Sequence, residues 1–155
     1  MTTPIVVPTP PPFDDELIDE LLRLPEGQRF ETKRVGENTK KIQSLVALAN
    51  TEGGLLLLGI EDEDKASGRD RVFGVEENPE SVDELRRLVG HRITPVIGPP
   101  SSEPLRFIQI GCTLRTGNLG SIIIVQVPRS TAVHSVVDGG TYVRYLKSNR
   151  QISAA

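Results

Sequence analysis

Four acidic residues fall where two predicted strands begin or end. Glu26 lies in the turn before the first strand, and Glu31 lies on that strand. Glu61 and Asp62 directly follow a second, strongly apolar strand. If the two strands are neighbours in one sheet, these carboxylates converge at one edge of it. Carboxylate oxygens suit Mg²⁺ or Mn²⁺, which can carry a phosphate substrate and activate water, so the pattern permits a metal site built from these four residues.

A lysine stands beside this acidic group. Lys33 lies two residues after Glu31 and therefore on the same face of the strand. Its ammonium could stabilise charge on a phosphoryl group, which would make Lys33 a catalytic partner of the nearby carboxylates. The Glu-x-Lys spacing is common by chance, however, and the same two side chains can form an ordinary surface ion pair. Both interpretations stay open from the residues alone.

Positive charge gathers in two further places. Lys40 and Lys41 open a predicted helix, where free backbone amides also favour phosphate. Arg144, Lys147 and Arg150 lie in a C-terminal stretch that holds no acidic residue. Together with the strand lysine, the side chains of these two clusters could follow a nucleic-acid backbone without reading its sequence. A solvated face that keeps the protein soluble is the alternative.

The bulk composition narrows the class of protein. A chain of 155 residues suits one domain, and a net charge of -3 counts against a free-standing nucleic-acid binder unless the charge is segregated. Aromatic residues are only 4%, which disfavours a fold that stacks single-stranded RNA on aromatic platforms. Cys112 is expected to be a buried filler and His134 a structural residue. With no secretory signal and no apolar run long enough for a bilayer, we expect a cytoplasmic protein.

Hydrophobic periodicity predicts the elements that position these residues. Residues 1–12 hold five prolines and are expected to form a disordered tail before a domain over 13–155. The predicted helices cover 13–24, 39–51 and 78–91, and the predicted strands cover 28–34, 55–60, 71–75, 105–114, 121–127 and 141–146. The strand over 55–60 is apolar on both faces, which indicates a central position, and the last strand is expected to close the sheet. The predicted architecture is a single α+β domain, with a mixed, mostly antiparallel sheet packed by about three helices.

Taken together, these segments resemble a known family. The stretch that reads ANTEGGLLLLGIED, residues 49–62, is preceded by Phe30-Glu31-Thr32-Lys33 and followed much later by Tyr142-Val143-Arg144. This order resembles the Schlafen-type AlbA-like domain over about residues 16–150. Prokaryotic members of that family are mostly described as nucleic-acid-binding modules, so the resemblance implies such a role.

The same resemblance implies an alternative. Animal Schlafen proteins use related lobes as metal-dependent endonucleases on tRNA and rRNA, with two glutamates spaced as Glu26 and Glu31 are here. Their third ligand is an aspartate after the glycine-rich strand, where Glu61 takes the nearest position and Asp62 is the fallback. Those nucleases pair two lobes in a horseshoe, a shape that this chain could restore as a homodimer.

The sequence thus supports three functional hypotheses. The first is a nucleic-acid-binding domain, for DNA or RNA, that contacts backbone phosphates through Lys33, Lys40, Lys41, Arg144 and Lys147. The second is a Mg²⁺- or Mn²⁺-dependent endoribonuclease acting on tRNA-like RNA, with Glu26, Glu31 and Glu61 on the metal and Lys33 on the scissile phosphate. The third is a protein-interaction or oligomerisation module that binds no nucleic acid.

Overall fold

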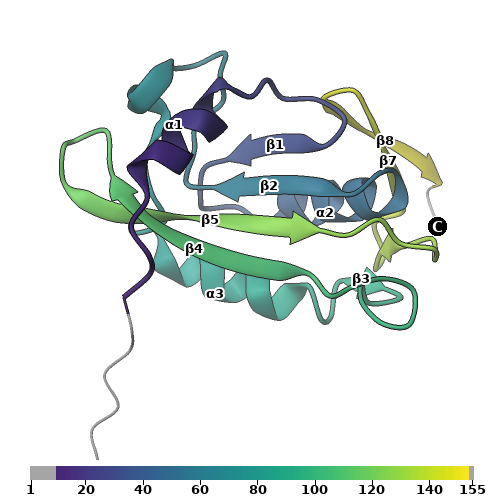
Figure 1. Ribbon diagram of the computed structural model, residues 1–155. Helices are drawn as coiled ribbons and strands as arrows, with labels where there is room; N and C mark the ends of the chain where they lie inside the picture. Colours follow the sequence, from purple (N-terminus) through teal and green to yellow (C-terminus); the bar gives the residue numbers. More distant parts are fainter. Residues whose placement is uncertain (1–9, 154–155) are drawn as a thin grey trace, which may run out of the picture.

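The structure of the chain is a computed structural model that describes residues 10–153 (Figure 1). Residues 1–9 of the predicted tail lie outside the described residues. The elements in chain order are α1 (Asp15–Arg23), β1 (Phe30–Lys33), α2 (Thr39–Asn50), β2 (Gly54–Leu58), the 3-10 helix η1 (Gly68–Arg71), α3 (Pro79–Leu88), β3 (Ile93–Thr94), β4 (Arg106–Thr113), β5 (Leu119–Val127), β6 (Ser135–Val136), β7 (Thr141–Tyr145) and β8 (Ser148–Ser153). Three α-helices and mixed, mostly antiparallel strands confirm the predicted α+β class.

Four strands form the main sheet in the order β1-β2-β5-β4. β1 and β2 are parallel and are joined through α2, whereas β2 with β5 and β5 with β4 are antiparallel. Lys33 pairs with Leu58, so the carboxyl ends of β1 and β2 lie side by side. The strand that carries Glu31 and the strand that precedes Glu61 are therefore neighbours, which is the condition set above for the acidic residues to converge.

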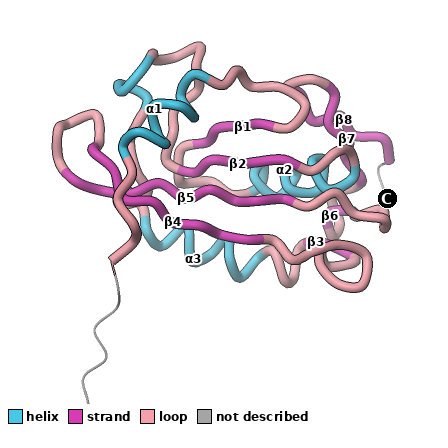
Figure 2. The backbone as a smooth tube through the Cα atoms, viewed as in Figure 1, coloured by secondary structure: helices cyan, strands magenta, loops and turns pink. Residues whose placement is uncertain are grey.

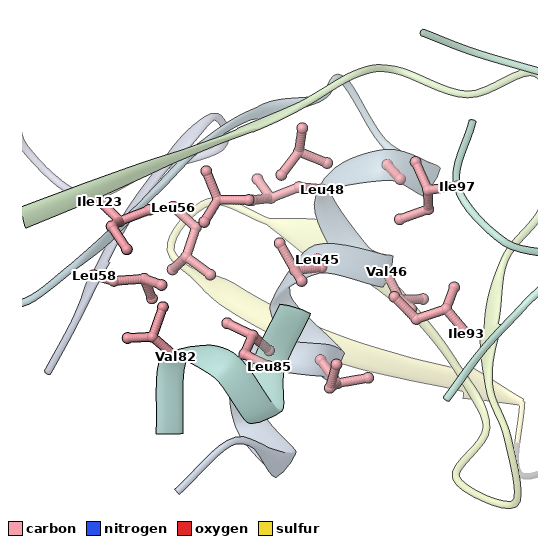
Figure 3. Close-up of a cluster of buried hydrophobic side chains, with 14 of the residues drawn as sticks. Leu45, Val46, Leu48, Leu56, Leu58, Val82, Leu85, Ile93, Ile97 and Ile123 are labelled. Carbon is pink, nitrogen blue, oxygen red and sulfur yellow. The ribbon is translucent and has the colours of Figure 1, made fainter. Parts of the chain in front are cut away.

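β2 lies inside the sheet and is covered on both faces, as its apolar sequence predicts. Leu56 and Leu58 belong to a cluster with residues of α2 and α3, including Leu45 and Leu85 (Figure 3). Leu57 belongs to the other cluster, which contains residues of α1. Successive strand residues point to opposite faces, so α2 and α3 cover one face and α1 covers the other (Figure 2).

The glycine pair before β2 has a steric role. Gly53 and Gly54 have φ of 73° and 146°, conformations that L-residues with a side chain rarely adopt. A Cβ on Gly54 would lie 2.2 Å from the backbone oxygen of Arg29, and one on Gly53 would lie 2.7 Å from the amide of Arg129. The two glycines therefore let the start of β2 lie close to the backbone of Arg29, before β1, and of Arg129, after β5.

The outer edge of β1 is blocked by the chain itself. Phe30 and Thr32 direct their main-chain groups away from β2, because Arg29 and Lys33 supply the carbonyls that bond to it. The Phe30 carbonyl accepts hydrogen bonds from the Gly27 amide and from the Arg144 guanidinium. The Thr32 amide donates to the Glu26 carboxylate. The edge is thus occupied without another strand.

This blocked edge explains the main error in the predicted sheet. The strand predicted over 141–146 does not close the main sheet; β7 instead pairs with β8, which was not predicted, in a separate two-stranded sheet beside α2 (Figure 1). β3 and β6 form another small pair that was also not predicted.

The strand predicted over 71–75 is reduced to a single bridge, in which Val72 pairs with Ile60 of the strand predicted before it. The 3-10 helix η1 ends at Arg71, directly before this bridge.

Candidate nucleic-acid interface

A polar cavity of about 350 Å³ lies where the parallel strands β1 and β2 end. Its lining consists of Thr32, Lys33, Arg34, Val35, Glu61, Asp62 and Lys65. The carboxyl ends of parallel strands are the usual place for ligand sites in sheets with parallel pairs, because the strand ends and the following loops converge there. Three of the residues selected from the sequence, Lys33, Glu61 and Asp62, meet in this cavity.

Arg34 is held in place by carboxylates and an aromatic ring. Its Nη2 atom lies 2.9 Å from Glu77 Oε2, and its Nη1 atom lies 3.4 Å from Glu61 Oε2. Its guanidinium carbon stacks 3.8 Å from the centroid of the Phe73 ring. The hydrogen bond to Glu77, reinforced by the charges of both carboxylates, raises the pKa of Arg34 despite partial burial. Arg34 therefore balances acidic charge at the cavity.

The two carboxylates of the cavity are bound to nearby backbone amides. Glu61 Oε1 accepts from the Asp62 amide at 2.8 Å, and Asp62 Oδ1 accepts from the Asp64 amide at 2.9 Å. Lys33 is one-third exposed, and Lys65 is exposed and forms no ion pair within residues 10–153. The two lysines are consequently the cations of the cavity that are available to a ligand.

Glu26 does not line this cavity; its carboxylate binds Thr32 of β1. Its Oε1 atom accepts from the Thr32 amide at 3.1 Å and from the Thr32 hydroxyl at 2.8 Å. The Thr32 hydroxyl also accepts from Arg71 Nη2 at 3.4 Å. Thr32 lines the cavity, so one residue separates Glu26 from it.

Glu31 points to the opposite face of β1 from Thr32, as consecutive strand residues do. It is buried, and its Oε1 atom lies 3.2 Å from Arg144 Nη1 and 3.9 Å from Lys33 Nζ. Within the part of the chain that the structure describes, no group of three His, Cys, Asp or Glu side chains is placed to hold a metal ion. The arrangement seen here therefore does not fit a metal shared by Glu26, Glu31 and Glu61.

Two of the predicted phosphate contacts are buried. Lys41 donates to the Glu37 carbonyl, and burial lowers the pKa of the Lys41 ammonium. The Arg144 side chain is 0% exposed and connects β7 to β1. Lys40 and Lys147, in contrast, are exposed. The sequence pattern located these cations but could not distinguish the buried pair from the exposed pair.

Arg34 and Lys65 were missed as cavity residues. The available signal was their position, because Arg34 directly follows Lys33 and Lys65 lies three residues after Asp62.

The two other residues considered for chemistry are structural, as expected. Burial raises the pKa of the Cys112 thiol to about 11, so the reactive thiolate is scarce near neutral pH. His134 is fully buried, with Nδ1 2.6 Å from the Pro95 carbonyl and Nε2 2.7 Å from the Ser130 hydroxyl.

Among the helices that the structure describes, none has both the length and the apolar character needed to cross a membrane. Neither the structure nor the comparisons below support a homodimer.

Comparison with solved structures gives a match to the DIP2311 protein from Corynebacterium diphtheriae. The crystal structure of that protein has 20% sequence identity to this chain and superposes with a TM-score of 0.53. The match covers 81% of this chain and 22% of the DIP2311 chain, so this chain spans about a fifth of that protein's length. This match shows that the two proteins share a fold.

Comparison with protein families identifies the chain more directly. The family model described as "Schlafen, AlbA_2" matches residues 26–153, which include all of the strands and the whole polar cavity. The chain belongs to the Schlafen AlbA_2 family.

Proposed function

We propose that this chain is a nucleic-acid-binding domain that contacts backbone phosphates at the carboxyl ends of β1 and β2. Membership of the Schlafen AlbA_2 family supports a nucleic-acid-related function. The observation that carries the proposal is the polar cavity with two available lysines, Lys33 and Lys65, at its lining. Lys40, exposed in the first turn of α2, is a third cation on the segment that follows β1.

The charge at this cavity suits a polyanion even though the whole chain is acidic. Lys33, Arg34 and Lys65 give three positive charges against the two lining carboxylates of Glu61 and Asp62. From outside the lining, Glu77 also pairs with Arg34, and Glu31 lies 3.9 Å from Lys33. Lys65 is therefore the cation of the cavity without an ion pair in residues 10–153, and its charge can attract a phosphate there.

The proposal is tested by fluorescence anisotropy with labelled tRNA and duplex DNA. The affinity is expected to fall steeply between about 50 and 200 mM salt, because bound cations release counterions from the phosphates. The Lys33→Gln/Lys65→Gln double variant is expected to bind more weakly. The slope of log affinity against log salt concentration should become shallower by about two, because each phosphate contact contributes about one.

The matched control is Arg87→Gln/Arg129→Gln, which removes two exposed cations that do not line the cavity. It should keep the wild-type salt slope. Absence of binding to either polymer at low salt would overturn the proposal, and a stable oligomer in the same samples would then favour the protein-interaction hypothesis.

A metal-dependent endoribonuclease is the second candidate. The observation in its favour is that Lys33, Glu61 and Asp62 line one cavity. Mg²⁺ is often bound by one or two carboxylates together with substrate phosphates, so two carboxylates could suffice once RNA is present.

The test of this candidate is incubation of tRNA with and without Mn²⁺. Cleavage that requires Mn²⁺ and disappears in Glu61→Gln would support it, with Glu103→Gln, an exposed acid outside the cavity, as the control. Intact tRNA with the wild-type protein, or cleavage that survives in Glu61→Gln, would remove it.

A further inference from the structure

The hairpin of β7 and β8 presents apolar side chains to solvent beside two cations. Tyr145 and Leu146 at its end are 53% and 62% exposed, and Ile152 on β8 is 62% exposed. Lys147 and Arg150 lie between them in sequence and are exposed. Neither cation forms an ion pair with an acid of the described residues 10–153. At the turn end of the hairpin, exposed Tyr145 and Leu146 adjoin Lys147, a combination that suits a binding surface.

The tip of the hairpin is fixed in a conformation that its sequence does not favour. Leu146 has φ of 54°, in the left-handed region where a leucine is uncommon. The Leu146 amide donates to Gln28 Oε1 at 2.7 Å, and Gln28 Nε2 donates to the Arg144 carbonyl at 3.0 Å. Gln28 thus bonds to the backbone on either side of Tyr145, at Arg144 and Leu146. Backbone strain that the surroundings hold in place is concentrated at binding sites.

The turn end of the hairpin is anchored to β1 and to the turn before it through Arg144, which pairs with Asn149 one position from the turn. Arg144 Nε donates to the Gly27 carbonyl at 3.0 Å, Nη2 donates to the Phe30 carbonyl at 3.3 Å, and Nη1 pairs with Glu31. The buried guanidinium therefore joins the small sheet to the main one. The exposed side chains at the tip stand on a rigid support, which lowers the entropy lost when a ligand binds.

Tyr145 offers one exposed ring for stacking, not the set of aromatic side chains that the composition disfavours. The Arg150 guanidinium carbon lies 4.0 Å from the centroid of its ring, so Arg150 covers one side of the ring. Of the chain's two tyrosines, Tyr142 packs against the core, whereas Tyr145 leaves about half of its surface open. A nucleobase can stack on an exposed aromatic ring, and an arginine behind that ring adds cation–π attraction.

We propose that the β7–β8 hairpin binds unpaired nucleotides, with a base stacked on Tyr145 and the flanking phosphates on Lys147 and Arg150. This inference rests on the proposed nucleic-acid-binding function and specifies its substrate as single-stranded or looped DNA or RNA. Bases inside a duplex are already stacked on one another and cannot cover the Tyr145 ring. Leu146, which extends from the tip beside Tyr145, packs against the edge of the bound base.

A tryptophan reporter tests the contact directly, because the chain has no Trp of its own. In Tyr145→Trp the indole replaces the phenol ring at the same position, and stacking of a base quenches its fluorescence. Addition of oligo(dT) or oligo(U) is expected to quench it at the concentrations at which anisotropy reports binding. A blunt duplex and vesicles of anionic lipid are expected to leave it unchanged. Leu119→Trp, exposed on β5, is the control that should not respond.

Affinity measurements give the second test. Tyr145→Ala is expected to weaken binding of both oligonucleotides by about 5- to 100-fold, the usual effect of removing one stacking aromatic side chain. Tyr145→Phe keeps the ring and should stay within about twofold of wild type. Val133→Ala removes an exposed apolar side chain elsewhere and should have no effect. Comparison of oligo(dT) with oligo(U) shows whether the hairpin distinguishes DNA from RNA.

Two results would overturn the hairpin site alone. One is wild-type affinity of Tyr145→Ala, and the other is indole fluorescence of Tyr145→Trp that responds to anionic vesicles and not to oligonucleotides. In either case the salt-dependent binding that Lys33 and Lys65 support would still stand. Loss of all polymer binding by the wild-type chain would overturn the proposed function together with the hairpin site.

Discussion

Glu31 has one carboxylate oxygen paired with Arg144 and a second oxygen, Oε2, that is buried without a hydrogen-bond partner among the described residues. A half-satisfied buried carboxylate is costly and depends strongly on the partner that it has. Arg144 is the better satisfied of the two, because two backbone carbonyls and Asn149 also accept from it. At the scale of single residues, this pair links the C-terminal hairpin to the sheet.

The stability of the chain should therefore depend on Arg144. Arg144→Ala leaves the buried Glu31 carboxylate with only Lys33, 3.9 Å away, as an ion-pair partner, so we expect a loss of about 3–5 kcal/mol in the free energy of unfolding, measured by urea titration. Lys147→Ala, an exposed cation three residues later, is the control and should change it by less than about 0.5 kcal/mol. Equal stability of the two variants would show that the pair does not hold the hairpin.

At the scale of elements, α1 is attached to β4 by one carboxylate. Asp15 accepts from the Thr113 amide at 2.8 Å and from the Thr113 hydroxyl at 2.7 Å, and it lies 3.0 Å from Arg69 Nη2. Partial burial by itself raises the pKa of Asp15, but the hydrogen bonds from Thr113 and Arg69 outweigh it and hold the pKa below its usual value. One side chain thus joins α1, β4 and the 3-10 helix.

This attachment should make stability depend on acid. Because the pKa of Asp15 is lower in the folded state, its stabilisation is complete above the ordinary value of 3.8 and is lost as the pH falls through the folded value. Asp15→Asn should cost about 1–2 kcal/mol at pH 7, and the gap to wild type should narrow as the pH falls below 3.8. Urea midpoints at neutral and acidic pH measure the gap. Glu20→Gln, exposed on the same helix, should show no such gap, and a constant gap for Asp15→Asn would contradict the argument.

At the scale of the whole molecule, the sequence predicted the parts of the fold that depend on local patterns. The helix after Asn78-Pro79 begins as predicted, with the Asn78 side chain accepting from the Ser81 amide. The central strand β2 and the β4–β5 hairpin are confirmed for the same reason, since their apolar spacing is visible in a few residues.

The errors come from contacts between residues far apart in the sequence. β7 stays out of the main sheet, whose β1 edge is filled by Glu26 and Arg144, and Arg144 reaches that edge across more than a hundred residues. The residues of the candidate site also fall into a group that local sequence patterns predict and a group that depends on long-range contacts. Lys33, Glu61 and Asp62 meet as parallel strand ends must, whereas the different directions of Glu26 and Glu31 and the burial of Arg144 depend on packing that charge patterns do not encode.

The blocked edge of β1 has a consequence for behaviour at high concentration. An open outer strand is a template on which a second copy of the chain can add its own strand and begin fibrous aggregation. Here the outward main-chain groups Phe30 O and Thr32 N are already bonded to Gly27, Arg144 and Glu26. Glu26, Gly27 and Arg144 therefore leave these two groups of β1 unavailable to the added strand of a second copy.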